Sequence, residues 1–313
     1  MGMIINGQWE EIDRIHDKSR YQRPVSKYNN KYKIEDLISN SGRYYLIGSW
    51  SCPWSHRTLI YRHLLGLEKH IPLHMTGGKK IQGYSANHGD SWHIPGTLKE
   101  DHQSITHLHE LYVFNDKHYT GRSTVPILWD SKTLSIISNE STDIIDLLIK
   151  ATGQINPQQA TLLDPPSAIT HKAVLALNTK IYEQFSNGVY QAAFAKSQQA
   201  YDIAIRNVFE LLDFLEEKLQ HRRFLFGDQP SHSDWLLFPS LVRFDIEYYL
   251  HSGCCHKQLR DYPKLWLYAR RLYHTGKIAD TVNFEAIHAS NYFNTPIKPL
   301  MPTQNWQQLD STQ

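Results

Sequence analysis

The sequence predicts an α/β domain followed by an all-helical domain, and three observations support this order. The chain has 313 residues, of which 41% are hydrophobic, so it is long enough to bury more than one core. Strand-like aromatic and β-branched runs lie before residue 150, whereas apolar residues at helical spacing dominate from residue 168 onward. Gly153, Pro157, Pro165 and Pro166 separate the two parts and predict a linker over residues 151–166.

The first domain is predicted over residues 41–150. Its short aromatic and β-branched runs predict four strands, at residues 43–47, 71–75, 124–130 and 134–137. One helix is expected between Pro53 and Gly66, and a second after Asn139. Residues 76–110 show little pattern, and an apparent loop of that length is usually either functional or a wrong assignment of its elements. The expected order of elements is therefore β-α-β followed by β-β-α.

The second domain is predicted over residues 167–275 and should be entirely helical. Apolar spacing predicts four helices, at about residues 168–186, 199–219, 233–250 and 262–274. Ser231 and Asp234 have the spacing of a capping box at the start of one of them. Residues 1–40 are polar and predict an N-terminal arm, and residues 276–313 predict a tail that packs back on the domains.

Composition argues against several classes of partner. Lys and Arg total 33 and Asp and Glu total 31, which leaves +2 and no basic stripe for nucleic acid. No apolar stretch reaches the ~20 residues of a membrane span, and the first residues lack the basic and apolar regions of an export signal. His107 and His109 have no third ligand nearby, so no metal site is expected. No nucleic acid, membrane or metal partner is therefore expected.

The chain has three cysteines, Cys52, Cys254 and Cys255. They are too few and too badly spaced for a disulfide scaffold or a four-cysteine zinc site, which indicates a cytoplasmic protein. Cys254 and Cys255 are adjacent, and we expect two ordinary thiols at a helix end rather than a strained disulfide.

Cys52 is the sharpest chemical feature of the sequence. It directly precedes Pro53, so it is expected at or next to the N-cap of a helix, where free amides and the helix dipole favour a thiolate. The fourth position of this motif is Ser55 instead of a second cysteine, so a resolving thiol would have to come from solution. A buried, inert cysteine is the alternative interpretation.

Two further segments carry weaker signals. Pro126 cannot donate a ladder hydrogen bond, so its place at the head of a strand needs a turn or a cis bond, as at the thiol site of a thioredoxin-like fold. Otherwise it marks only an irregular strand start. Glu140 and Ser141 are expected at the start of a helix. Either the carboxylate simply interacts favourably with the helix dipole, or the pair binds a γ-glutamyl group.

The amino-acid sequences of these segments resemble those of one protein family. The resemblance rests on residues 52–58 (CPWSHRT), 119–130 (YTGRSTVPILWD), 139–141 (NES), 187–190 (NGVY), 234–235 (DW), 241–245 (LVRFD) and 281–284 (TVNF). They are similar to the glutathionyl-hydroquinone reductases, the Xi class of glutathione transferases, over nearly the whole chain. This implies a thioredoxin-like α/β domain joined to an all-α domain.

The resemblance also implies an activity and a set of site residues. Cys52 would attack the glutathione sulfur of an S-glutathionyl-hydroquinone and release the hydroquinone, and a second glutathione would free the thiol. Glutathione is the implied co-substrate, and the residues implied to hold it are Trp92, Arg122, Val125, Glu140 and Ser141.

Tyrosines are implied at the hydroquinone side: Tyr190 and, less directly, Tyr248 and Tyr292. For Tyr248 a plain core aromatic fits equally well. Ser55 and residues 290–295 depart from the family wording, which bears on the substrate range. A homodimer formed through the helical domains is expected by resemblance only.

Two other functions fit the same sequence. One is an omega-like thioltransferase or dehydroascorbate reductase, which would keep Cys52 but change the substrate. The other is a binding module with the glutathione transferase fold and no catalysis, against which the retained cysteine argues.

Overall fold

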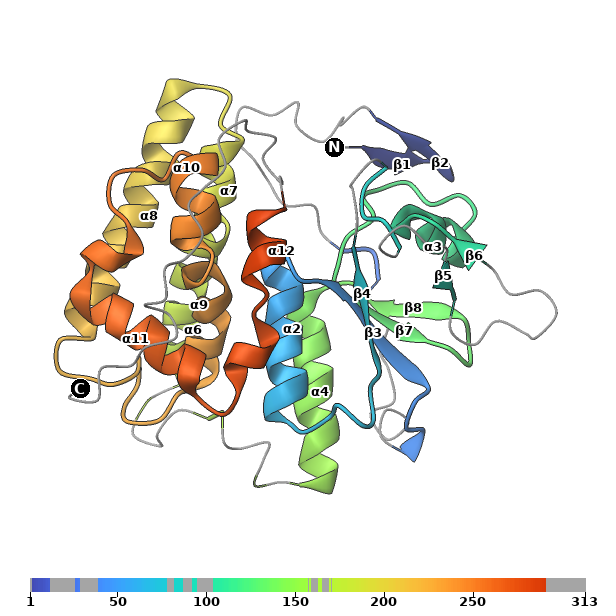
Figure 1. Cartoon of the computed structure of the whole chain (residues 1–313), viewed down its shortest axis with the longest axis horizontal. Helices are drawn as coiled ribbons and strands as arrows, with labels where there is room; N and C mark the ends of the chain where they lie inside the picture. Colours follow the sequence, from blue (N-terminus) through green and yellow to red (C-terminus); the bar gives the residue numbers. More distant parts are fainter. Residues whose placement is uncertain are drawn as a thin grey trace. The chain divides into compact units, whose positions relative to one another are not determined.

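The structure is a computed structural model that describes residues 2–11, 26–28, 39–77, 82–86, 92–94, 104–156, 158, 163–164, 169 and 171–290. The chain forms two compact units, which divide between Ala160 and Thr161 (Figure 1). The first unit contains a mixed sheet with helices, and the second is built from helices, as the sequence predicts.

The first unit is organised around a four-stranded sheet in the order β4-β3-β7-β8. The strands are β3 (Tyr44–Ser49), β4 (Leu73–Thr76), β7 (Ile127–Asp130) and β8 (Ser135–Ser138). β4 runs parallel to β3, whereas β7 and β8 are antiparallel to their neighbours. All four predicted strands are present, and β7 begins one residue after Pro126, so the proline stays out of the ladder.

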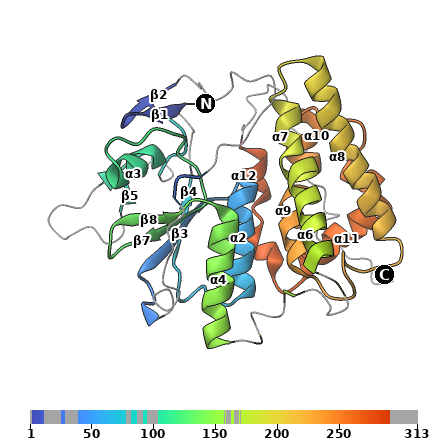
Figure 2. The same ribbon diagram turned by 180° about the vertical axis from the view of Figure 1, so that it is seen from behind.

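Helices cover both faces of this sheet. α2 (Pro53–Leu64) and α4 (Ser141–Ile155) lie side by side on one face, and α3 (Leu108–Asn115) lies on the other (Figures 1 and 2). Proline is well placed at the first position of α2, because the amide it lacks would have no partner inside the helix. α4 buries Ile144, Ile145 and Leu148 at helical spacing, which orients it on the sheet.

α3 and two short strands correct the expectation that residues 76–110 are patternless. β5 (Trp92–His93) pairs with β6 (Ser104–Ile105), and α3 follows. The start of α3 is held by Glu110, whose carboxylate accepts the His107 amide at 2.9 Å. Histidine is not a usual N-cap residue, and two-residue strands show no period, so the sequence gives little local signal for these elements.

A small N-terminal hairpin also goes beyond the prediction of a polar arm. β1 (Met3–Ile5) pairs with β2 (Gln8–Glu10) across a turn in which Asn6 and Gly7 both have positive φ. The Ile4 side chain is fully buried, and the Ile4 backbone exchanges hydrogen bonds of 2.8 and 2.9 Å with Gly121. The hairpin is therefore tied to the segment that leads to Arg122 and Val125.

The second unit contains the predicted helices, with altered boundaries. Its elements are α6 (His171–Lys180), η2 (Ile181–Ser186), α7 (Gly188–Ala193), α8 (Gln198–Lys218), α9 (His232–Leu241), η3 (Phe244–Tyr248), α10 (Tyr249–His251), η4 (Leu259–Asp261), α11 (Pro263–His274), η5 (Ile278–Thr281) and α12 (Phe284–His288). Two predicted helices are not uniform, because η2 and η3 are π-helical. Short π segments inside helices occur often at functional sites.

The capping box at the start of α9 is confirmed. Asp234 is fully buried and accepts the backbone amide of Ser231 at 2.7 Å. Its other oxygen accepts the Leu225 amide at 3.0 Å and the Tyr268 hydroxyl at 2.9 Å. The role of this motif is thus structural, as the sequence predicts. Among the described residues, no helix is both long and apolar enough to cross a membrane.

Candidate active site

Cys52 is the N-cap of α2, as the sequence predicts. Its backbone is extended, with φ of −83° and ψ of 121°, and its carbonyl accepts the His56 amide at 3.0 Å. The thiol is buried, with 6% of the residue exposed, and it does not cap its own helix. The Sγ atom instead donates to the Val125 carbonyl oxygen at 3.6 Å. The thiol thus lies at the positive end of the helix dipole, which favours an anion.

The strands explain why the thiol lies where it does. β3 and β4 are parallel, so their carboxyl ends meet at one edge, and Cys52 follows β3 by three residues. Ser55 is fully buried under this turn, and its hydroxyl accepts the Ser49 amide at 3.2 Å. A Cβ atom on Gly48 would lie only 3.3 Å from the Ser55 Cβ, so the strand and the helix pack closely here. Ser55 is therefore part of the packing of the motif.

Val125 forms a cis peptide bond with Pro126, one of the two explanations expected for this proline. Val125 is buried, and its carbonyl faces the thiol. Arg122 lies three residues earlier, and its carbonyl oxygen accepts the Tyr119 hydroxyl at 3.1 Å. This segment thus brings a backbone edge to Cys52 within the first unit.

Glu140 and Ser141 lie at the N-terminus of α4. Glu140 is the N-cap, and its amide donates to the Ser138 hydroxyl at 3.1 Å. Ser141 is buried as the first helical residue, and its hydroxyl donates to the Glu140 carboxylate at 3.4 Å. The predicted position at a helix start is confirmed, and the pair offers a carboxylate and a hydroxyl together at the positive end of the helix dipole.

Trp92 lies in β5 and stacks on His74 of β4, with ring centroids 3.8 Å apart and an angle of 13° between the planes. The His74 Nε2 lies 2.7 Å from the Ala86 carbonyl oxygen, which can only accept, so Nε2 carries the proton. Burial lowers the pKa of His74, although the bond to Ala86 opposes this shift, and the ring is neutral at neutral pH. Sequence reasoning did not find His74, because its partners are distant in the chain.

The predicted tyrosines belong to the second unit. Tyr190 in α7 and Tyr248 in η3 are both buried, and their rings meet edge to face with centroids 6.2 Å apart. Each tyrosine lies in or near a π-helical segment. The two segments, η2 and η3, contact each other through Phe185 and Phe244, whose ring centroids are 5.6 Å apart. Tyr292 lies outside the described residues.

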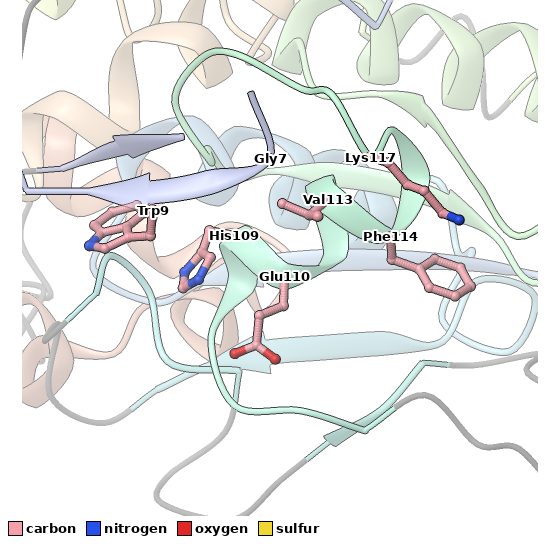
Figure 3. Close-up of a pocket in the computed structure, with 7 residues that line it drawn as sticks. All are labelled: Gly7, Trp9, His109, Glu110, Val113, Phe114 and Lys117. Carbon is pink, nitrogen blue, oxygen red and sulfur yellow. The ribbon is translucent and has the colours of Figure 1, made fainter. Parts of the chain in front are cut away.

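Other features of the described residues lie apart from these side chains. A groove between β2 and α3 is lined by residues none of which was predicted for the site: Gly7, Trp9, His109, Glu110, Val113, Phe114 and Lys117 (Figure 3). No group of three or more His, Cys, Asp or Glu side chains in the described part of the chain is arranged to hold a metal ion.

Cys254 and Cys255 are both free thiols in the structure. Cys254 is buried, and burial raises its pKa to about 12, so it is a poor nucleophile. Cys255 is exposed and remains open to reagents.

Comparisons with known proteins agree with this geometry. Residues 51–151 match the family described as "Glutathione S-transferase, N-terminal domain", and residues 198–271 match "Glutathione S-transferase, C-terminal domain". The glutathionyl-hydroquinone reductase YqjG of Escherichia coli is 36% identical over 99% of this chain and 97% of that protein. The glutathionyl-hydroquinone reductase PcpF of Sphingobium chlorophenolicum is 34% identical over 97% of each.

Two solved structures agree as well. The glutathione-bound structure of YqjG superposes with a TM-score of 0.78 at 33% identity, covering 98% of this chain and 97% of that one. The glutathione transferase Xi of Phanerochaete chrysosporium superposes with a TM-score of 0.79 at 32% identity, covering 90% of this chain and 97% of that one. The chain therefore belongs to the glutathione transferase superfamily, and within it to the glutathionyl-hydroquinone reductases of the Xi class.

Proposed function

We propose that this protein reduces S-glutathionyl-hydroquinones to hydroquinones, with glutathione as co-substrate and Cys52 as the nucleophile. The observation that carries the proposal is a lone, buried cysteine at a helix N-cap, 3.6 Å from the carbonyl before the cis-proline. Membership of the glutathionyl-hydroquinone reductases supports the same reaction. The family and the retained thiol favour it over the omega-like and non-catalytic alternatives.

The reaction has two thiol-exchange steps. The Cys52 thiolate attacks the glutathione sulfur of the conjugate, so an S–S bond forms and the bond from sulfur to the aromatic carbon breaks. That carbon keeps the electron pair and takes up a proton, which gives the hydroquinone. A second glutathione thiolate then attacks the mixed disulfide and leaves as oxidised glutathione, and Cys52 is restored. Two glutathione sulfurs are oxidised for each aromatic carbon reduced.

The glutathione part of the substrate is assigned to the first unit. The Val125 backbone would pair with the peptide, and Glu140 with Ser141 would bind the γ-glutamyl amine and carboxylate. Trp92 and Arg122 would close the site over the tripeptide. The positive end of the α2 dipole would stabilise the thiolate in each step.

The hydroquinone part is assigned to tyrosines. Tyr190 and Tyr248 contact each other edge to face, so they form one aromatic pair. Their rings would pack on the hydroquinone, and the phenol hydroxyls would hydrogen-bond its oxygens as they gain charge. Tyr292 is included in this proposal from the family resemblance.

The decisive experiment is the intact mass of the protein after incubation with a glutathionyl-hydroquinone in the absence of free glutathione. Wild type should gain one glutathione and release one hydroquinone, and Cys52→Ala should gain none. Because Cys255 is exposed and could be modified by itself, Cys255→Ala is the matched control and should react like wild type. An adduct that persists in Cys52→Ala would contradict the assignment of the nucleophile.

We further propose that the protein is cytoplasmic, since reduced glutathione is kept at high levels in that compartment. We also propose that it is a homodimer. Among the described residues, the exposed large hydrophobic side chains are Leu175, Tyr182, Ile203 and Phe214. They lie on α6, η2 and α8, and the Lys180 ammonium lies 4.1 Å from the Phe214 ring, so α6 and α8 are neighbours here. We propose that these side chains take part in the dimer interface, because exposed apolar surface is common at subunit contacts.

A further inference from the structure

One phenol hydroxyl joins two segments of the candidate glutathione site. Tyr112 lies in α3 and is completely buried. Its hydroxyl donates to the Thr124 carbonyl at 2.7 Å, and it accepts the Thr124 amide at 3.2 Å and the Asn139 side-chain amide at 3.0 Å. A hydroxyl has one proton and two lone pairs, so these three bonds use its full capacity.

The two residues that Tyr112 binds directly precede residues of the site. Thr124 is followed by Val125, whose carbonyl accepts the Cys52 thiol. Asn139 is followed by Glu140, the N-cap of α4. Both backbone groups of Thr124 and the Asn139 amide bind the same oxygen, and the Asn139 amide also donates to the Thr124 hydroxyl at 3.3 Å. The Tyr112 oxygen is therefore the centre of a small network that fixes the spacing between the two segments. The segments belong to different elements, and this hydroxyl connects them directly.

We propose that Tyr112 is a positioning residue for glutathione, which sets the distance between the Val125 backbone and the Glu140–Ser141 pair. The inference rests on the proposed function, because it assumes that these two segments bind the two ends of the same tripeptide. Burial raises the pKa of Tyr112, while its hydrogen bonds to Thr124 and Asn139 oppose the shift, and the phenol keeps the proton that it donates.

A role in filling the core is separable from this one. The Tyr112 ring packs against Tyr119 and Tyr28, with centroids 5.1 and 5.8 Å away. Phenylalanine at position 112 would keep these ring contacts and remove only the oxygen. Tyr44 is an equally buried tyrosine at the start of β3, the end of the strand away from Cys52. Tyr44→Phe is therefore a matched control for the loss of a buried hydroxyl.

The test is calorimetric binding of S-methylglutathione, whose blocked thiol cannot exchange with Cys52. Tyr112→Phe should raise Kd about tenfold, which corresponds to about 1.4 kcal/mol. Tyr44→Phe should bind like wild type. In steady-state assays Tyr112→Phe should raise KM for the conjugate more than it lowers kcat, which a general loss of packing would not do.

A second variant approaches the same bridge from the other side. Asn139→Ala removes the amide that donates to both Tyr112 and the Thr124 hydroxyl, so it should raise Kd at least as much as Tyr112→Phe does. The two effects should not add, because both variants break the same network. Asn139→Ala also replaces Tyr112→Phe if that variant does not fold. Unchanged binding in both variants, or equal weakening in Tyr44→Phe, would overturn the inference. Failure of wild type to bind S-methylglutathione would overturn the proposed function, and this inference with it.

Discussion

At the residue scale, His74 shows how an ordinary strand residue can serve the site. Its ring stacks on Trp92 at 3.8 Å, and its Nε2–H donates to the Ala86 carbonyl, so it holds two points of the loop that follows β4. Neither partner is near it in sequence. The position of Cys52 at a helix start, in contrast, could be predicted, because the adjacent Pro53 is a local signal for the first position of a helix.

His74→Ala should therefore remove the ring stack that positions Trp92. An aromatic pair contributes ~0.5–1.5 kcal/mol beyond its buried area, so KM for the glutathionyl conjugate should rise about two- to tenfold while kcat changes less. Steady-state kinetics measure both constants. His63→Ala is the control, because His63 lies on α2 and pairs with Glu68 at 2.7 Å. A normal KM in His74→Ala would show that the stack does not position Trp92.

At the scale of elements, the four strands of the central sheet, α2 and α4 could be predicted from local patterns, whereas α3, β5 and β6 could not. α3 begins with a histidine cap, and β5 and β6 have two residues each, too few to show a period. The N-terminal hairpin was not predicted because each of its strands has only three residues, although Asn6 and Gly7 form a dipeptide typical of a hairpin turn. α3 and the hairpin are both stabilised by contacts with distant residues. Tyr112 was missed for the same reason, because it lies in the unpredicted helix and bonds to Thr124 and Asn139.

The hairpin gives an element-scale prediction. Ile4 is fully buried beside Gly121, so Ile4→Ala should lower the free energy of unfolding by about 2–5 kcal/mol, the usual cost of truncating a buried aliphatic side chain. Urea denaturation measures this value. Gln8→Ala, on an exposed position of β2, should change it by less than about 0.5 kcal/mol. Equal effects of the two variants would mean that the hairpin does not stabilise the unit.

At the scale of the whole molecule, the sequence predicts two differently built units because each has its own hydrophobic period. In the helical unit, this hydrophobic period predicts that a segment is helical but not which kind of helix it forms. Apolar spacing predicts one helix over residues 168–186, yet the structure changes from α6 to the π-helical η2 at Ile181. A π segment keeps a similar order of apolar residues, so the spacing alone does not separate the two forms. Tyr190 and Tyr248, which are proposed for the hydroquinone side of the site, lie next to or within such segments.

The assembly of the molecule is predicted from the exposed face of α6, η2 and α8. Ile203 and Phe214 are eleven residues apart on α8, about three helical turns, so they share one face. Phe214→Glu should place a charge in the proposed interface and convert the dimer to a monomer, because an unpaired buried charge is costly. Sedimentation equilibrium measures the mass. Lys69→Glu, on an exposed position of the first unit, introduces the same carboxylate elsewhere and should leave the dimer intact.

Activity adds a second readout to this experiment. All residues proposed to bind glutathione belong to the first unit, so a monomeric Phe214→Glu protein should still form the Cys52–glutathione adduct. Loss of the dimer together with the adduct would mean that a second copy completes the site. A dimer that survives Phe214→Glu would instead place the interface on another surface, since a carboxylate among Leu175, Tyr182 and Ile203 would not be tolerated in a buried contact.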